Sequence, residues 1–339
     1  MPMLTAEKLI IAFKKLNSCI SDPDEPFKNL VRSAQNSNAW FRPREVQRAL
    51  DGLQQMLNAK DLEQWFSKIK VSDTPKRIGL ILAGNIPMVG FHDVLCVLAT
   101  GHTALIKLSS SDDKLLPALL SRLTDAEPLL KDRIIYTERL MDFDAVIATG
   151  SNNTSRYFDH YFGKVPHIIR RNRNSVAILT GNESPEQLAA LGHDIFDYYG
   201  MGCRNVSKIY IPEGYDIAKF YVPLEPFKSV RDHFKYSNNY DYNKSIYLVN
   251  QTPHFDNGFL LLKEDKGLSS PLAVLFFERY NDLSEVIGDL AGQHDNIQCM
   301  VSAADLGPDL QQVGFGETQR PRLWDYADNV DTIDFLSKI

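Results

Sequence analysis

Residues 76–110 read KRIGLILAGNIPMVGFHDVLCVLATGHTALIKLSS and contain two short apolar runs, separated by a turn and a helical pattern. The first run, at 77–83, has the length and composition of a strand that is buried on both faces of a parallel sheet. Gly84-Asn85-Ile86-Pro87 then turns the chain, and a helical pattern leads through Gly101 to the second run at 103–108. A strand, a helix and another strand in this order indicate a parallel βαβ unit.

The same alternation continues as far as residue 180. Helices are predicted at 115–123 and 154–162, and strands at 134–136, 144–149, 167–170 and 175–179. The sequence therefore predicts an α/β fold with a doubly wound, Rossmann-like parallel sheet over residues 76–180. Such sheets bind ligands at the carboxyl ends of their strands, where this chain carries Asn85, Lys107 to Ser110, and Gly150-Ser151.

Three further segments flank this domain. Residues 1–75 have apolar side chains at helical spacing and predict a helical N-terminal segment. Residues 181–315 predict a second α/β domain, although no element is assigned to the polar, tyrosine-rich stretch at 236–247. Residues 316–339 include a terminal apolar segment that is a candidate for docking on another subunit, which makes a homodimer a candidate assembly.

The second domain centres on residues 198–212, YYGMGCRNVSKIYIP, in which Cys203 lies between a helix and a strand. The helical pattern opens at Ser184 and ends near 199, where Gly200 suits the position after a helix. Residues 206–212 alternate between apolar and polar and predict a strand. A glycine-bent connection of this kind can expose a nucleophilic thiol at the mouth of a cleft. The alternative is a small buried cysteine beside a turn.

Composition and charge exclude several classes of protein. The net charge of −6 gives no electrostatic attraction to nucleic acid. The four cysteines are far apart and form no CxxC pair, so we expect no zinc or other metal site, no disulfide framework, and a reducing compartment. The N-terminal residues lack the pattern of a signal peptide, and no stretch approaches the about 18 apolar residues of a membrane span. We therefore expect a cytoplasmic protein.

Four motifs, in this order, resemble the aldehyde dehydrogenase superfamily. More narrowly, they resemble its acyl-CoA reductase branch, which includes the fatty acid reductase subunit of bacterial luminescence. The motifs are AGNIP at 83–87 with GHTALIKLSS at 101–110, ATGS at 148–151, GMGC at 200–203 and LWDYADNVDT at 323–332. The resemblance covers the chain from residue 76 onward and implies an aldehyde dehydrogenase-like pair of cofactor and catalytic domains.

The resemblance implies a reductase that converts an acyl-CoA, or another acyl thioester, to an aldehyde. The Cys203 thiolate would attack the acyl carbonyl and form an acyl-cysteine, which hydride from a nicotinamide cofactor would then reduce. The side-chain amide of Asn85 and the backbone N–H of Cys203 would hold the oxyanion. His193, on the helix before Cys203, is a candidate acid or base as well as a candidate structural histidine, and His92 is a weaker candidate.

The resemblance also implies where the cofactor binds. Lys107 is similar to the lysine that contacts the adenosine ribose or its phosphate, and Ser109 and Ser110 follow it. Ser110 stands where NAD-preferring relatives often carry an acid, so we predict NADPH as the cofactor, with NADH as the alternative. Gly150 and Ser151 resemble the turn that faces the pyrophosphate, although a plain strand-to-helix turn is the other interpretation of Gly150.

Two glutamates of related enzymes are missing from this chain. Residues 170–174, RRNRN, replace the one that activates water, and Gly267 lies near the expected position of the one that steadies the nicotinamide ribose. Hydrolysis of an acyl-enzyme is therefore disfavoured relative to reduction. The basic residues at 170–173 either bind phosphates of CoA or of the cofactor, or form a solvated face.

Other functions stay open on the sequence alone. They are an acyl-phosphate reductase, acyl transfer or thioester hydrolysis through Cys203, and a non-catalytic nucleotide-binding subunit. The chain is also shorter than typical members of the superfamily, which leaves the substrate tunnel and the oligomer undefined.

Overall fold

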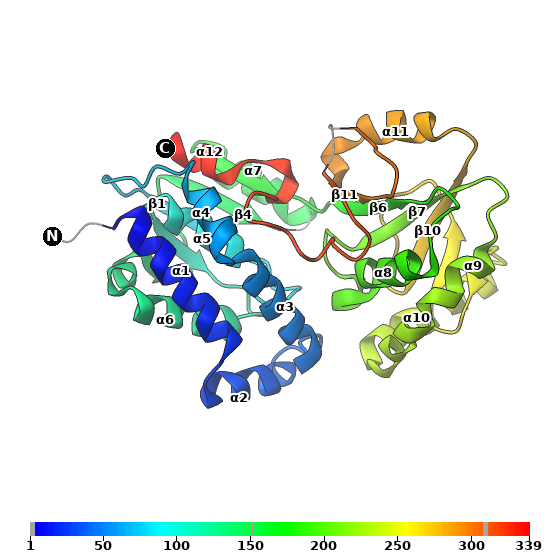
Figure 1. Ribbon diagram of the computed structural model, residues 1–339, viewed down its shortest axis with the longest axis horizontal. Coiled ribbons are helices and arrows are strands. Elements are labelled where there is room, and N and C mark those ends of the chain that lie inside the picture. Colours follow the sequence, from blue (N-terminus) through cyan, green and yellow to red (C-terminus); the bar gives the residue numbers. More distant parts are fainter. Residues whose placement is uncertain (1–3, 151, 308–310) are drawn as a thin grey trace. The chain divides into compact units, whose positions relative to one another are not determined.

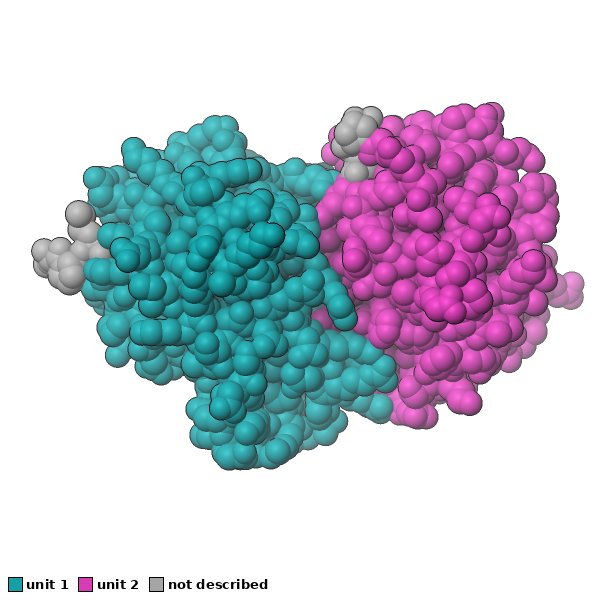
Figure 2. Space-filling view, viewed as in Figure 1, with its two compact units in different colours: residues 1–172, 320–339 teal, residues 173–319 magenta. Residues whose placement is uncertain are grey.

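The computed structural model describes residues 4–150, 152–307 and 311–339, in which a run of helices precedes two regions of strands and helices (Figure 1). The chain divides into two compact units, coloured separately in Figure 2. Unit 1 comprises Met1–Asn172 and Arg320–Ile339, and unit 2 comprises Arg173–Gln319. Each unit is built around a sheet of its own.

The sheet of unit 1 has the strand order β3-β2-β1-β4-β5, and all neighbouring strands are parallel. Ile78, Leu80, Ala104 and Ile106 have no exposed surface, because helices cover both faces of the central strands. This arrangement confirms the predicted doubly wound parallel sheet. The strands are β1 Arg77–Ile81, β2 Thr103–Lys107, β3 Ile134–Tyr136, β4 Ala145–Thr149 and β5 His167–Arg170.

Three helices connect these strands: α5 Phe91–Ala99, α6 Leu115–Ala126 and α7 Asn152–Phe162. The right-handed crossover rule puts α5 and α6 on one face and α7 on the other, because β1 to β3 and β4 to β5 progress in opposite directions along the sheet. The strand order therefore reverses between β1 and β4, the position at which such sheets bind ligands. The turns that follow these two strands carry Asn85 and Gly150.

The N-terminal segment is helical, as predicted. Leu9, Phe13 and Leu16 of its first helix are fully buried, and this helix packs against α6. The helices within residues 4–66 are α1 Ala6–Ser21, α2 Glu25–Ser33, α3 Pro43–Met56 and α4 Ala59–Phe66.

The C-terminal segment belongs to unit 1. Helix α12, Thr332–Ser337, packs against α5, and the imidazole Nε2 of His102 lies 3.1 Å from the carbonyl oxygen of Leu336. Arg170 donates to the carbonyl oxygen of Ala327 at 2.6 Å. The apolar segment that we considered for docking on another subunit is therefore docked on its own chain.

The sheet of unit 2 has the strand order β12-β11-β6-β7-β10-β9-β8 and is parallel except for the β8–β9 pair. The assignment of the run at 175–179 to the first sheet is wrong, because β6 pairs with β7 and β11. Consequently unit 2 begins at Arg173 rather than near residue 180. Its strands are β6 Asn174–Ile178, β7 Val206–Pro212, β8 Phe255–Asp256, β9 Leu261–Glu264, β10 Val274–Tyr280, β11 Ile297–Val301 and β12 Gln312–Val313.

Each face of this sheet has its own apolar core. Ala177, Ile209 and Ile211 point to the face covered by α8 Pro185–Phe196, α9 Ile217–Tyr221 and the 3-10 segment Val222–Asp232. Val176, Ile178 and Tyr210 point to the face covered by α11 Leu283–Ala291. Neighbouring residues of a strand point to opposite faces of the sheet, which is why each face has its own core. Helix α8 packs against β7, the strand that follows Cys203.

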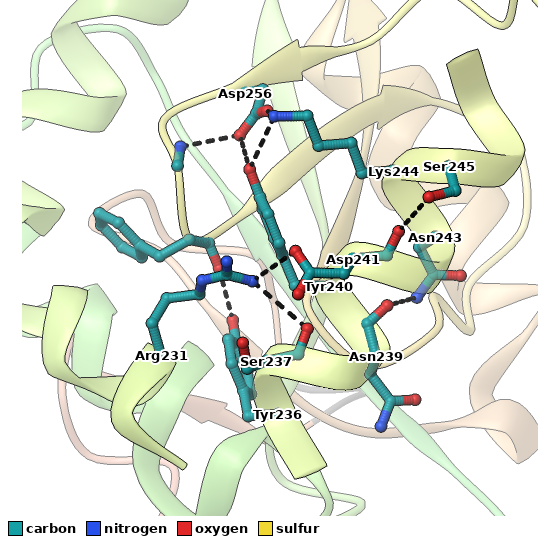
Figure 3. A network of polar contacts seen from close by, with 12 residues as sticks. Arg231, Tyr236, Ser237, Asn239, Tyr240, Asp241, Asn243, Lys244, Ser245 and Asp256 are labelled. Carbon is teal, nitrogen blue, oxygen red and sulfur yellow. Dashed lines mark hydrogen bonds and ion pairs between the residues drawn. The ribbon is translucent and has the colours of Figure 1, made fainter. Parts of the chain in front are cut away.

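The tyrosine-rich stretch without an assigned element forms α10, Phe234–Val249. Its buried positions, Tyr236, Tyr240, Asn243 and Tyr247, recur at helical spacing. Polar groups on this stripe have acceptors both outside and inside the helix: the Tyr240 hydroxyl donates to Asp256 Oδ1 at 2.5 Å, and Asn243 Nδ2 donates to the Asn239 carbonyl oxygen at 2.9 Å (Figure 3). A search for apolar periodicity misses this helix because hydroxyl and amide groups make its buried stripe polar.

Candidate active site

Cys203 lies on a loop of unit 2 that joins α8 to β7. Helix α8 begins with a capping box formed by Ser184 and Gln187 and ends at Phe196, before the predicted end at 199. Tyr198, Tyr199 and Gly200 then have φ angles of 54°, 59° and 78°. A left-handed backbone costs a residue with a side chain on the order of 1–3 kcal/mol, so contacts of the surrounding residues must hold this loop.

Two polar side chains form hydrogen bonds with the backbone of this loop, at Gly202 and at Cys203 itself. Asn205, which is 3% exposed, accepts a hydrogen bond from the Gly202 N–H at 2.8 Å. The amide of Asn205 donates to two carbonyl oxygens at the end of α8, at 3.1 and 2.9 Å. From β6, Ser175 Oγ donates to the carbonyl oxygen of Cys203 at 3.0 Å. The cysteine is thus presented by a loop tied to a helix end and to the sheet.

Cys203 is exposed, whereas Cys96 and Cys299 are buried and Cys19 is intermediate. Burial raises the pKa of the Cys96 thiol well above its ordinary value. All four cysteines are thiols rather than members of a disulfide. The exposed position overturns the alternative of a small buried cysteine beside a turn, and it gives Cys203 the accessibility that a nucleophile requires.

His193 lies in the last turn of α8, and half of its side chain is exposed. Its Nδ1 is 3.2 Å from Asp197 Oδ1, and its ring packs edge-on against Phe227 with 5.0 Å between the centroids. A carboxylate at Nδ1 fixes the orientation of an imidazole and leaves Nε2 for a second contact, as in many acid–base histidines. The contact with Phe227 also suits a structural role, so both interpretations of His193 stand.

Asn85 is exposed and lies in the turn of unit 1 that follows β1. The turn is tightly packed at Gly84, where a Cβ atom would come within 2.5 Å of Ser109 Oγ. At its other end Met88 has a φ of 57°, and its N–H donates to Asp112 Oδ2 at 2.6 Å. The turns after β1 and β2 therefore touch, and Asn85 lies on a backbone that is held at both ends.

Asp112 lies between β2 and α6, where its place in the sequence makes it a candidate cap of that helix and indicates no role at the Asn85 turn. It is 6% exposed, and burial raises the pKa of its carboxyl to about 6 although the Met88 N–H opposes the shift. An acidic residue before a helix ordinarily signals an N-cap. Here the carboxylate binds the N–H of a turn that lies 24 positions earlier in the chain, and no local pattern predicts such a contact.

The residues predicted to bind the cofactor gather at one edge of the unit 1 sheet. Lys107 ends β2 and is exposed, as is Ser110, while Ser109 accepts a hydrogen bond from the Ser111 N–H. Gly150 follows β4, donates to the Arg170 carbonyl oxygen at 3.3 Å, and precedes the start of α7. Ser151 lies outside the described residues. The structure thus brings together Asn85, Lys107, Ser109, Ser110 and Gly150 at the carboxyl ends of parallel strands.

The basic residues at 170–173 do not act as one cluster. Arg170 is 4% exposed, and its Nη2 is 2.6 Å from Asp93 Oδ1. Arg171 is exposed and pairs with Asp159 at 2.9 Å. Arg173 donates to the carbonyl oxygens of His294 and Ile297. Arg170 is therefore a buried structural ion pair, and it is neither part of a solvated face nor presented to a phosphate.

Within residues 4–150, 152–307 and 311–339, no three or more His, Cys, Asp or Glu side chains are grouped so that they would hold a metal ion. None of the helices in the described part of the chain has both the length and the apolar character needed to cross a bilayer.

The two sheets with their helices have the fold of aldehyde dehydrogenases. Aldehyde dehydrogenase 21 from Physcomitrella patens, solved with the reaction product succinate, matches 98% of this chain and 85% of its own, with a TM-score of 0.69 at 11% identity. The Mycobacterium tuberculosis aldehyde dehydrogenase complexed with NAD+ matches 92% of this chain and 77% of its own, with a TM-score of 0.64 at 11% identity. At such low identity these likenesses establish the fold alone.

The chain belongs to the acyl-CoA reductase (LuxC) family, whose sequence profile matches residues 23–219. The long-chain acyl-protein thioester reductase of Aliivibrio fischeri is 27% identical over 230 residues, which cover 60% of this chain and 47% of that protein. The long-chain acyl-protein thioester reductase 2 of Photobacterium leiognathi is 24% identical over 238 residues, which cover 61% and 49%. The chain spans about half the length of the curated relatives it matches. These findings confirm the predicted family.

Proposed function

We propose that this protein reduces an acyl thioester to an aldehyde, with NADPH as the hydride donor and Cys203 as the nucleophile. The overall reaction converts RCO–SR′, NADPH and a proton to RCHO, R′SH and NADP+. The observation that supports it most directly is an exposed cysteine on a braced, backbone-strained loop in a chain of the acyl-CoA reductase family.

In the first half-reaction the Cys203 thiolate attacks the carbonyl carbon of the thioester. A C–S bond to the enzyme forms, and the donor thiol leaves with the electron pair of its own C–S bond and takes up a proton. Negative charge develops on the carbonyl oxygen and requires preorganised donors. We assign that role to the Cys203 backbone N–H and the Asn85 amide, and we assign proton transfer at sulfur to His193, which Asp197 orients.

A nicotinamide cofactor, once bound, would supply the hydride that the acyl-cysteine carbonyl carbon accepts in the second half-reaction. Cys203 then leaves as a thiolate, and the aldehyde is released. The carboxyl edge of the unit 1 sheet suits a dinucleotide, because the strand order reverses there and α7 begins beside Gly150. Lys107 offers a cation at this edge, and the neutral hydroxyl of Ser110 does not repel a 2′-phosphate, which favours NADPH over NADH.

The donor thiol is either CoA or a protein cysteine. The sequence motifs favour an acyl-CoA, whereas the two relatives are named for an acyl-protein thioester. Both donors present the same carbonyl to Cys203, so the chemistry at the sulfur is the same for both. A cofactor oxidation assay with a long-chain acyl-CoA and with an acylated protein thiol separates the two donors.

The test of the proposal combines NADPH oxidation with thiol labelling. Acyl-CoAs of graded chain length should support NADPH oxidation by the wild-type chain, and Cys203→Ala should abolish it, because no other exposed cysteine is available. With iodoacetamide at neutral pH, Cys203 should label faster than Cys19, and a long-chain acyl-CoA should protect it. Lys107→Ala should raise the KM for NADPH and leave the labelling rate unchanged.

Each rival function predicts a different result. Retained NADPH oxidation by Cys203→Ala refutes the proposal. Release of free fatty acid without NADPH oxidation indicates a thioesterase, and turnover with acyl phosphate alone indicates an acyl-phosphate reductase. Binding of NADPH without labelling or turnover at Cys203 indicates a non-catalytic nucleotide-binding subunit.

A further inference from the structure

We propose that Asn205 is a positioning residue that aims the backbone N–H of Cys203 at the oxyanion, a role that rests on the acylation of Cys203 proposed above. Its side chain and its main chain bind the same residue, Gly202, which immediately precedes the cysteine. Nothing in the family resemblance assigns a role to Asn205.

Asn205 holds Gly202 from both sides. The side-chain oxygen of Asn205 accepts from the Gly202 N–H at 2.8 Å, and the backbone N–H of Asn205 donates to the Gly202 carbonyl oxygen at 3.0 Å. The carbonyl oxygen of Gly202 belongs to the same peptide group as the N–H of Cys203. Fixing that oxygen therefore fixes the plane in which the Cys203 N–H lies.

The direction of the N–H follows from peptide geometry. The described residues contain no cis peptide bond, and in a trans peptide the C=O and N–H bonds point in opposite directions. Because the Gly202 carbonyl points toward the Asn205 backbone, the Cys203 N–H points away from Asn205. An oxyanion donor must be held in its direction before charge develops, since otherwise reorganisation cancels the gain.

The anchor for this arrangement is the end of α8. The amide of Asn205 donates to the carbonyl oxygens of Asp194 and Asp197 at 3.1 and 2.9 Å, and both acceptors lie at the C-terminal end of α8. Ser175 Oγ holds the next carbonyl, that of Cys203, from β6. The peptide group before the cysteine is thus fixed by the Asn205 backbone N–H, and the one after it by Ser175. The side chain of Asn205 links the N–H of Gly202, in the preceding peptide group, to α8 and so holds Asn205 in place for its backbone contact.

The test compares two reactions of the same sulfur. Acylation by a long-chain acyl-CoA builds charge on a carbonyl oxygen, whereas alkylation by iodoacetamide displaces iodide from carbon and builds none there. For Asn205→Ala we expect the acylation rate to fall by about 10²-fold, as for loss of an oxyanion donor, while the alkylation rate changes little. Asn205→Asp keeps the acceptor for Gly202 but sets a carboxylate oxygen against two carbonyl oxygens at the end of α8, so its acylation rate should also fall below that of wild type.

Asn243→Ala is the matched control. Asn243 is 7% exposed in the same unit, and its amide also donates to two carbonyl oxygens, both at 2.9 Å. One belongs to Asn239 of α10 (Figure 3), and the other belongs to Leu272 in the segment before β10. Asn243→Ala should lose about as much stability as Asn205→Ala but keep the wild-type rates of acylation and alkylation at Cys203. Equal losses of acylation and alkylation in Asn205→Ala, or no loss of either, would overturn the assignment. A wild-type protein that alkylates at Cys203 but never acylates would instead overturn the proposed function, and this role with it.

Discussion

Replacing Arg170 with methionine is expected to destabilise unit 1 by about 3–5 kcal/mol, the usual cost of breaking a buried ion pair from one side. Arg170 is 4% exposed and donates to Asp93 Oδ1 at 2.6 Å, to the Ala327 carbonyl oxygen at 2.6 Å and to Thr332 Oγ1 at 3.1 Å. Methionine fills much of the same volume but offers no donor. The carboxylate of Asp93, which is 8% exposed, would then be buried without a counter-charge.

Tryptophan fluorescence reports on this unit separately. The three tryptophans, Trp40, Trp65 and Trp324, all belong to unit 1, and unit 2 contains none. Urea unfolding followed at the tryptophans should therefore show the loss directly. With a urea m-value of about 2 kcal/mol/M, the midpoint of Arg170→Met should fall by about 2 M.

Arg171→Met provides the control, because Arg171 pairs with Asp159 at side chains that are 60% and 43% exposed. Such a surface pair contributes less than about 1 kcal/mol. The double variant Asp93→Asn with Arg170→Met should recover part of the loss, since the uncompensated charge is gone. A shift for Arg170→Met no larger than that of Arg171→Met would refute the reasoning, and an unchanged midpoint with a raised KM for NADPH would show that Arg170 binds a phosphate.

Three further predictions concern Asp112 and Gly84 of unit 1 and His193 of unit 2. The raised pKa of Asp112, about 6 against an ordinary 3.8, means that the folded state holds its proton more tightly. The free energy of unfolding of the wild type should therefore fall as pH rises from 4 to 6. Measured by urea unfolding, the stability of Asp112→Asn relative to wild type should rise by up to about 3 kcal/mol between pH 4 and pH 7. The same pH dependence of stability in both proteins would contradict this. Gly84→Ala should lower the free energy of unfolding by about 1–3 kcal/mol, because the new methyl group forces the turn away from Ser109. Adding Ser109→Gly to this variant should restore stability, and no recovery would show that contact with Ser109 is not the cause. His193→Ala should lower the acylation rate by at least about 10²-fold if His193 transfers the proton, and an unchanged rate with lowered stability would leave it a structural residue.

Much of the fold follows from local patterns. The apolar runs at β1, β2 and β4 indicate strands buried on both faces, and a helix between each pair makes them parallel. Strand β7 spans Val206–Pro212, the range that the alternation of its side chains predicts. The turn chemistry is local as well, since Gly200 has a positive φ beside the cysteine where a helix end was expected.

The helix α10 shows where local patterns mislead. Tyr236, Tyr240 and Tyr247 occupy one buried face, but each ring ends in a hydroxyl, and Asn243 completes the stripe. Whether such a face is buried depends on acceptors elsewhere, such as Asp256 and the carbonyl oxygen of Phe259. Those partners are separated from the helix in sequence, so periodicity alone leaves the segment unassigned.

The sequence by itself determined that this chain forms parallel α/β layers and that Cys203 lies between a helix and a strand, because both depend on residues that are near neighbours along the chain. Only the tertiary structure decided that β6 belongs to the second sheet, that Arg170 is buried against Asp93, and that Asp112 and Asn205 hold the two loops. The physical reason is that a strand's partner and a side chain's burial are set by hydrogen bonds and packing between distant segments, and residue spacing carries no record of these.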